Sequence, residues 1–332
     1  MGNDSFPAKC LETERKHKEA ADMGNTPTGR FAPTPSGRMH LGNVFAALLA
    51  WLDVRHEGGR LVLRIEDLDT QRTSPAFARQ LMDDLRWLGL DWDEGGLTPK
   101  YMQSCRTAYY EAAFHTLEER GLLYPCYCSR TERMAASAPH REDGAVVYSG
   151  KCFRLTADER AALEAAGKRP AWRVHCPDRE VTVDDGSCGP YTENLARDCG
   201  DFIVRRNDGV FAYQLAVVVD DALMGVNRVV RGRDLLCSAP RQAWLHEELG
   251  CPPPRFFHVP LLLAPDGRRL AKRDRDLDMG ALRERFAPEE LTGLLAFWAG
   301  LLDKPEKVTA RELAEGFSWA KVPKNDIVVD LA

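Results

Sequence analysis

The chain has 332 residues, of which 44% are hydrophobic and 29% charged, a composition that supports a buried core and excludes a wholly disordered or fibrous protein. Its 45 Lys and Arg against 50 Asp and Glu give a net charge of −5, which excludes a uniformly basic nucleic-acid binder but allows a local basic surface. The longest apolar run, residues 294–302, is far shorter than the ~20 residues of a membrane span, and the charged N-terminus is unlike a signal peptide. We expect a cytoplasmic protein without a membrane partner, whose ten cysteines are metal ligands and core thiols.

The first 120 residues predict alternating strands and helices. Residues 1–28 are polar, lack sustained apolar periodicity and predict a mobile extension. Strands are predicted at Gly29–Ala32 and residues 60–65, and helices at residues 44–54, 75–88 (capped by Ser74) and 107–120. Strands that alternate with helices predict the doubly wound, Rossmann-like α/β class, with a parallel sheet covered by helices.

The middle of the chain has a different composition. Residues 126–200 are rich in Cys, Asp, Arg and Gly with weak periodicity, which predicts a small domain inserted within the sheet. After it come a strand at 202–206, a hairpin turn at Asn207–Gly209, a continuing strand over 210–219, a short strand at 229–232, a helix at 239–249 and a strand at 258–263. The last 50 residues predict a short helical tail.

Two motifs are suited to nucleotide chemistry. Residues 33–43 join the carboxyl end of a strand to a helix N-terminus, the place where open parallel sheets bind ligands and where free N–H groups favour phosphate. His40 can donate a hydrogen bond there, and Gly42 permits close approach. Residues 269–272 form a basic loop after the last sheet strand, from which Lys272 can reach the same crevice. Neither motif is specific alone, but their order and flanks together indicate an enzyme.

The segment RFAPTPSGRMHLGN resembles the HIGH-type signature of class I aminoacyl-tRNA synthetases in its glutamyl form. RIEDLDTQR, FAYQLAVVVDD and RGRDLL match the same catalytic domain in the same order. Because only 60 residues follow Lys272, the chain is similar to the truncated glutamyl-Q tRNA(Asp) synthetase family. This resemblance implies that ATP, with Mg²⁺, activates L-glutamate to glutamyl-adenylate, and that the glutamate passes to the queuosine base at the wobble position of tRNA(Asp).

The resemblance also implies the site residues. Arginine forks suit a substrate with two carboxylates, and Arg30 and Arg231 match glutamate-binding positions. Glu66 matches the residue that meets the ammonium, and Tyr213 a pocket hydroxyl. The glutamate set is Arg30, Phe31, Ala32, Pro33, Thr34, Glu66, Tyr213 and Arg231; the ATP set is His40, Gly42, Asn43 and Lys272, with His40 and Lys272 catalytic.

A cysteine cluster predicts one structural zinc ion. Cys126 and Cys128 are followed by Cys152, and thiolates are strong zinc ligands. From the residues alone, His140 and Tyr148 are equal candidates for the fourth ligand; the family resemblance favours Tyr148. Such an ion would stabilise a domain too poor in apolar residues to fold alone.

The resemblance divides the chain into a mobile extension (1–28), two halves of a nucleotide-binding catalytic domain (29–120 and 201–264), an inserted zinc-bearing subdomain (121–200), and a KMSKS-type loop with a helical tail (265–332). That loop departs from the family pattern Lys-Leu-Ser-Lys at Arg269 and Ala271. Two other functions stay open: a truncated glutamyl-tRNA synthetase that charges tRNA(Glu), and a catalytically silent tRNA-binding paralogue. A monomer is the default expectation.

Overall fold

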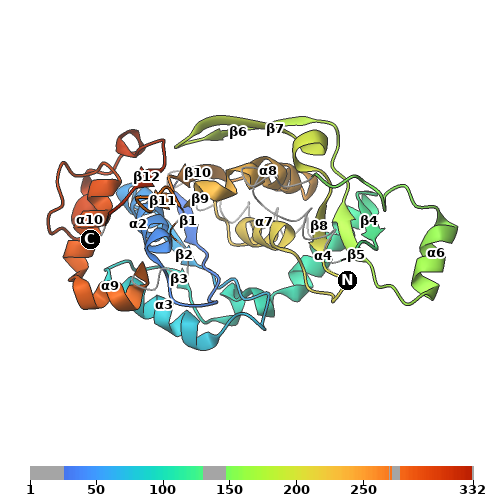
Figure 1. Cartoon of the computed structure of the whole chain (residues 1–332), viewed down its shortest axis with the longest axis horizontal. Coiled ribbons are helices and arrows are strands. Elements are labelled where there is room, and N and C mark those ends of the chain that lie inside the picture. The colour runs from blue at the N-terminus through green and yellow to red at the C-terminus, as the bar shows by residue number, and fades with distance from the viewer. Residues whose placement is uncertain (1–25, 130–146, 269, 271–276, 331–332) are drawn as a thin grey trace.

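The computed structural model describes residues 26–129, 147–268, 270 and 277–330 (Figure 1). A five-stranded parallel sheet in the order β10-β9-β1-β2-β3 forms the centre of this described part. Its strands are β1 (Thr28–Phe31), β2 (Arg60–Leu63), β3 (Glu94–Gly95), β9 (Arg228–Gly232) and β10 (Arg255–Val259). The expected strands at 29–32, 60–65 and 229–232 are thus confirmed within one or two residues.

Helices cover both faces of this sheet. Along β2, Leu61 and Leu63 belong to one core cluster and Val62 to the other, because successive side chains of a strand point to opposite faces. One cluster contains α2 (Leu41–His56), α3 (Pro75–Trp87), α9 (Met279–Arg285), α10 (Pro288–Trp298) and α11 (Ala310–Glu315); the other contains α4 (Thr107–Glu119), α7 (Tyr213–Leu223) and α8 (Ala239–Glu248). The doubly wound fold class is confirmed.

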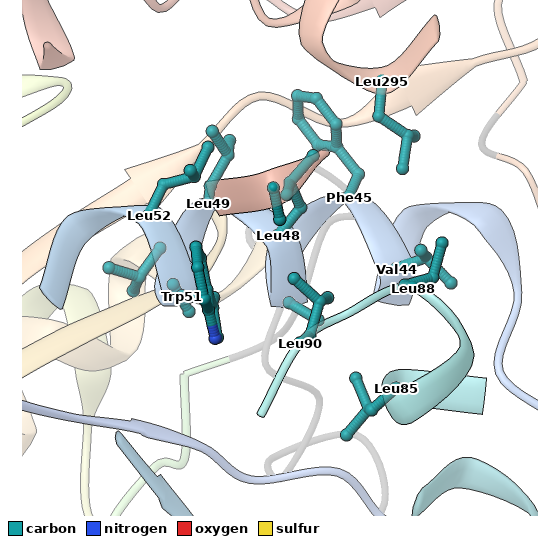
Figure 2. Packing of buried hydrophobic residues seen from close by; sticks show 14 of the residues in the cluster. Val44, Phe45, Leu48, Leu49, Trp51, Leu52, Leu85, Leu88, Leu90 and Leu295 are labelled. Carbon is teal, nitrogen blue, oxygen red and sulfur yellow. The ribbon is translucent and has the colours of Figure 1, made fainter. Parts of the chain in front are cut away.

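Helix α2 is buried nearly all round, as expected for a helix without a polar face. Figure 2 shows Leu49 and Leu52 on the same side as Leu295 of α10, while Leu85 and Leu90 lie on the opposite side. The helix therefore has a fixed position between the α3 region and the C-terminal helices. This rigidity holds its N-terminus, where the first sequence motif ends, at one point of the sheet edge.

A second sheet forms the narrow end of the molecule, opposite the C-terminal helices (Figure 1). It is antiparallel, in the order β4 (Leu123–Cys126), β5 (Ala171–Val174), β8 (Phe202–Arg205), and α6 (Ala157–Ala165) lies beyond it. The hairpin of β6 (Glu180–Asp185) and β7 (Gly189–Asn194) packs instead on α8 and on β10 of the parallel sheet. Short 3-10 turns occur at Pro99–Tyr101, Gln103–Cys105, Arg233–Ser238 and Trp319–Lys321, and a π-helical turn at Leu195–Cys199.

Two predicted elements are wrong. The segment 210–219 is not the second strand of a hairpin: after one bridge between Arg205 and Phe211, the chain enters α7. Its β-branched run favours a strand locally, but burial against β8, α4 and α8 stabilises a helix. The strand predicted at 258–263 is divided at Pro260, which has no N–H, into β10 and β11 (Leu262–Leu263).

The C-terminal tail is part of the core. β12 (Ile327–Val328) pairs with β11, and α11 packs on α2. Trp319 stacks on Phe257 and donates a 2.7 Å hydrogen bond from Nε1 to Oδ1 of Asp53, whose side chain is 1% exposed. Within the residues placed by the structure, no helix has the length and apolar character needed to cross a membrane.

The bond between Trp319 and Asp53 predicts an energetic coupling between tail and catalytic domain. A double-mutant cycle of Trp319→Phe and Asp53→Ala, measured by urea unfolding, should give a coupling of about 1.5–3 kcal/mol, as for a buried hydrogen bond to a charged group. A coupling below about 0.5 kcal/mol would show that the tail is held by apolar packing alone.

Candidate active site

A cleft of about 1160 Å³ opens at the carboxyl ends of β1, β2, β9 and β10. The residues that the sequence assigned to glutamate and ATP line it together: Arg30, Phe31, Ala32, Pro33, Thr34, His40, Gly42, Asn43, Glu66, Tyr213 and Arg231. Lys272, Arg269 and Ala271 lie outside the described residues; Leu270, which is described, lines the cleft. The structure thus brings to one cavity residues that are up to 201 positions apart, from Arg30 to Arg231.

The N-terminus of α2 opens into this cleft. His40 caps the helix, and its carbonyl accepts hydrogen bonds from the backbone N–H groups of Asn43 and Val44 at 2.9 and 3.1 Å. His40 also forms a backbone bridge with Asp278, which begins the chain after the basic loop. The chain that follows the basic loop is therefore in contact with the first motif, and Leu270, the described residue of the second motif, lines the same cleft. Free N–H groups and the positive end of the helix dipole make this position suited to phosphate.

Because Gly42 has no side chain, the imidazole of His40 can lie close to its backbone. A Cβ atom at position 42 would lie 3.3 Å from both Cε1 and Nδ1 of that ring. Gly42→Ala should therefore displace His40 by a few tenths of an ångström and slow adenylate formation about tenfold, because small misplacements of positioned groups are costly. Gly316→Ala is the matched control, since a Cβ there meets nothing within 4 Å and lies at the end of α11, away from the cleft. Equal activity of the two variants would remove His40 from the mechanism.

Residues of α7 and β9 hold the side chain of Arg30 in place. Its Nη1 donates to the carbonyl of Val230 at 2.9 Å, and its Nε lies 3.7 Å from Oδ1 of Asp221. The same Asp221 oxygen accepts a 2.6 Å bond from Nη1 of Arg64, which is fully buried. Burial lowers the pKa of Arg30, and Asp221 opposes this effect. The Asp221 carboxylate is therefore shared by two guanidinium groups, and Arg64 also has Glu66 and Asp220 as acidic partners, at 3.1 and 3.8 Å.

Arg231 has no acidic partner among the residues that the structure describes. Its side chain donates to Nε2 of His258 at 2.9 Å, to Oε1 of Gln242 at 2.7 Å and to the carbonyl of Leu235 at 3.2 Å, all neutral acceptors. In the described part of the chain, no carboxylate lies within 4.0 Å of its nitrogens, although the residue is only 5% exposed. A buried cation without a counter-ion is costly unless a ligand supplies the anion. Arg231 is thus suited to bind a carboxylate.

Glu66 and Tyr213 complete this part of the cleft. Oε1 of Glu66 accepts a 3.1 Å bond from Nη2 of Arg64. Burial raises the pKa of Glu66, against the influence of Arg64, so a cationic ligand group would stabilise its charged form. Burial also raises the pKa of Tyr213, which keeps its hydroxyl protonated as a donor. Together with Arg30 and Arg231, these two side chains supply two guanidinium groups, one carboxylate and one phenol, which complement an amino acid with a second carboxylate.

The sequence analysis missed the residues that support this site. Asp220 and Asp221 end the apolar run of α7, and both are buried. Asp220 binds Arg106 at 2.6 Å and accepts from Tyr110 at 3.0 Å. Paired acids at the end of an apolar segment are a usable signal, because buried carboxylates are rare unless they are paired.

The cysteine cluster lies at the second sheet, away from the cleft. The sulfurs of Cys126, Cys128 and Cys152 are all within 4.8 Å of one another, and those of Cys128 and Cys152 are 3.6 Å apart. The hydroxyl of Tyr148 lies 3.6 and 3.3 Å from the sulfurs of Cys126 and Cys128. Sulfurs on one tetrahedral zinc would be ~3.8 Å apart, given Zn–S bonds of ~2.3 Å, so this donor set fits a metal ion. His140 lies outside the described residues.

The expectation of core thiols holds only in part. Cys105, Cys176, Cys188, Cys199 and Cys237 carry thiols that form no disulfide bond. Cys105 is exposed, so the prediction of a core thiol is wrong for this residue.

Comparisons with known proteins agree with this geometry. The family described as tRNA synthetases class I (E and Q), catalytic domain, matches residues 28–325. The chain is 52% identical over 307 residues to the glutamyl-Q tRNA(Asp) synthetase of Symbiobacterium thermophilum (90% of this chain, 94% of that protein) and 47% identical over 306 residues to that of Nitratidesulfovibrio vulgaris (90% and 94%). A solved glutamate tRNA ligase of Elizabethkingia meningosepticum, in complex with its amino acid, superposes with a TM-score of 0.77 at 29% identity, covering 92% of this chain and 67% of that one.

Proposed function

Because this chain belongs to the family of class I tRNA synthetases for glutamate and glutamine, we propose that it activates L-glutamate with ATP and transfers the glutamyl group to queuosine in tRNA(Asp). The observation that carries the amino-acid specificity is the pair Arg30 and Arg231 at the floor of the cleft, the second without a carboxylate partner among the described side chains. The similarity to glutamyl-Q tRNA(Asp) synthetases over nine-tenths of the chain supports the nucleic-acid substrate.

In the first step, an oxygen of the glutamate α-carboxylate attacks the α-phosphorus of ATP, a P–O bond forms, and pyrophosphate leaves. No covalent bond to the enzyme is needed, so we assign catalysis to positioning and to stabilisation of phosphate charge. His40 and the N-terminus of α2 are placed in this role, with Mg²⁺ carried by the nucleotide. Lys272 is assigned to the same phosphates; the contact between His40 and Asp278, and the position of Leu270 in the cleft, support this assignment.

We assign glutamate recognition to Arg30, Arg231, Glu66 and Tyr213, which line the same cleft. The two arginines take the substrate carboxylates, Glu66 takes the ammonium, and Tyr213 donates a hydrogen bond. Glutamine lacks the second carboxylate, so it would leave a buried guanidinium without an anion. In the second step, a hydroxyl of the queuosine cyclopentene ring attacks the adenylate carbonyl, an ester forms and AMP leaves.

Pyrophosphate exchange into ATP tests the activation step without any tRNA. Exchange should depend on glutamate and be at least a hundredfold weaker with glutamine. A silent tRNA-binding paralogue would give no exchange. An enzyme that exchanges only after tRNA(Glu) is added would support the truncated glutamyl-tRNA synthetase instead.

We also propose that Cys126, Cys128, Cys152 and Tyr148 hold one zinc ion with a structural role. The position of the Tyr148 hydroxyl beside two of the sulfurs supports tyrosine as the fourth ligand. In this proposal, residues 121–200 include a zinc-bearing subdomain, and the active species is a monomer.

A further inference from the structure

A line of buried hydrogen bonds runs from the β6–β7 hairpin to Arg231. Oδ2 of Asp185, at the end of β6, lies 2.6 Å from Nδ1 of His258 on β10. Nε2 of the same ring lies 2.9 Å from Nε of Arg231 on β9. The histidine is fully buried and the aspartate 2% exposed. Three strands that meet at one end of the cleft therefore join through a single imidazole.

The Arg231 guanidinium and the Asp185 carboxylate determine which nitrogen of the His258 ring carries the proton. A guanidinium only donates, so Nε2 of His258 must carry a lone pair. A carboxylate accepts, so the ring proton must lie on Nδ1 and point to Asp185. The imidazole is therefore neutral and present as one tautomer.

We propose that Asp185 and His258 are positioning residues that hold the guanidinium of Arg231 in its glutamate-binding orientation, by fixing the Nδ1–H tautomer of His258. This inference rests on the proposed function, in which Arg231 binds a substrate carboxylate. Neither Asp185 nor His258 lines the cleft itself, and both act on the substrate through Arg231, which His258 contacts. Gln242 holds a second nitrogen of the same guanidinium, and Gln214 in turn holds Gln242 at 2.7 Å.

The contacts of Asp185 make Asp185→Asn an informative change. Its Oδ1 accepts hydrogen bonds from the backbone N–H groups of Ser187, Cys188 and His258 at 3.0, 2.8 and 3.2 Å. An asparagine must keep its oxygen on that side, which turns its NH₂ group toward Nδ1 of His258. The ring then has to move its proton to Nε2, which faces a donor of Arg231. Two donors cannot bond, so the guanidinium is expelled from its position.

Steady-state pyrophosphate exchange with Asp185→Asn tests the proposal. We expect the KM for glutamate to rise by about 10–100-fold with the KM for ATP within twofold of wild type, because only one of the two arginines is displaced. His258→Gln should stay closer to wild type, since its amide can donate to Asp185 and accept from Arg231, whereas His258→Leu should match Asp185→Asn. Equal changes in both KM values, or no rescue by Gln relative to Leu, would overturn the proposal.

A spectroscopic readout separates this inference from the proposed function. In ¹⁵N NMR of histidine-labelled protein, the wild type should show an unprotonated Nε2 and a protonated Nδ1 for the resonance that disappears in His258→Gln. In Asp185→Asn, the proton of the His258 ring should lie on Nε2 and Nδ1 should be unprotonated. The opposite tautomer in the wild type would overturn the inference, whatever the activity. If the wild type shows the expected tautomer but no pyrophosphate exchange into ATP, the result would contradict only the proposed function.

Discussion

Arg231→Gln is expected to lower kcat/KM for glutamate in pyrophosphate exchange by about 10³, with the KM for ATP unchanged. The guanidinium presents a fork to a carboxylate, and two charge-assisted hydrogen bonds of roughly 1.5–3 kcal/mol each account for a loss of about 4 kcal/mol. The same variant should also lose most of the preference for glutamate over glutamine, because the uncharged side chain no longer requires an anion. Folding should be unaffected or stabilised, since the variant removes a buried charge that has no acidic partner in the described part of the chain.

Arg228→Gln is the matched control on the same strand. Arg228 lies at the amino end of β9 and binds Asp53 at 3.2 Å and Glu57 at 2.9 Å. Its replacement should lower stability and leave the KM for glutamate unchanged. Arg231→Lys retains the charge without the planar fork and should fall between wild type and Arg231→Gln. A change of less than threefold in Arg231→Gln would contradict the assignment of this residue to the substrate.

Cys128→Ser is expected to abolish zinc binding and to unfold the end of the molecule that contains the second sheet. Among the described residues, the apolar cluster there contains Tyr124, Cys126 and Cys152, with three partly buried residues packed against it, and α6 buries no residue. Such a core cannot support a domain by itself, and structural zinc contributes on the order of 10 kcal/mol in small domains. The midpoint temperature should fall by about 10 °C, which corresponds to a loss of several kcal/mol.

The loss of structure in Cys128→Ser should also disturb the cleft. β8 belongs to the second sheet, and its residues Phe202 and Ile203 line the cavity. Activity should therefore fall together with the zinc content, measured by elemental analysis, and protease should cut within residues 121–175 first. Cys105→Ser is the control, since this free thiol is exposed and outside the cluster. A metal-free protein with unchanged melting and protease resistance would contradict a structural zinc.

The fold class could be predicted because apolar runs, turn residues and caps agree locally. Ser74 followed by Pro75 marks the start of α3 as predicted, and the side chain of Ser74 accepts from the backbone of Ala76. The prediction of a strand at 210–219 was wrong for the opposite reason. Its β-branched residues favour extended structure, and only packing of α7 between two other helices and β8 decides for a helix. Long-range burial of this kind has no local signal.

The candidate site likewise has residues that could be predicted from the sequence and residues that could not. The described residues of the two motifs and of the family resemblance lie in one cleft, because strand ends and a helix N-terminus meet there by topology. Their supports were missed: Asp185 is 46 residues from Arg231, on a hairpin whose packing on β10 could not be derived from spacing. In the proposed function, glutamate specificity depends on such buried partners as much as on the residues that line the cavity. The roles assigned to the lining residues stay predictions until the variants are measured.

The attachment point of the glutamyl group is the most direct test of the central claim. Isotopically labelled glutamate, ATP and purified tRNA(Asp) would be incubated with the enzyme, and the nuclease-digested tRNA examined by mass spectrometry. We predict label on the queuosine nucleoside of the anticodon, and none when the tRNA lacks queuosine. Label on the 3′-terminal adenosine, or equal labelling of both tRNA preparations, would contradict it.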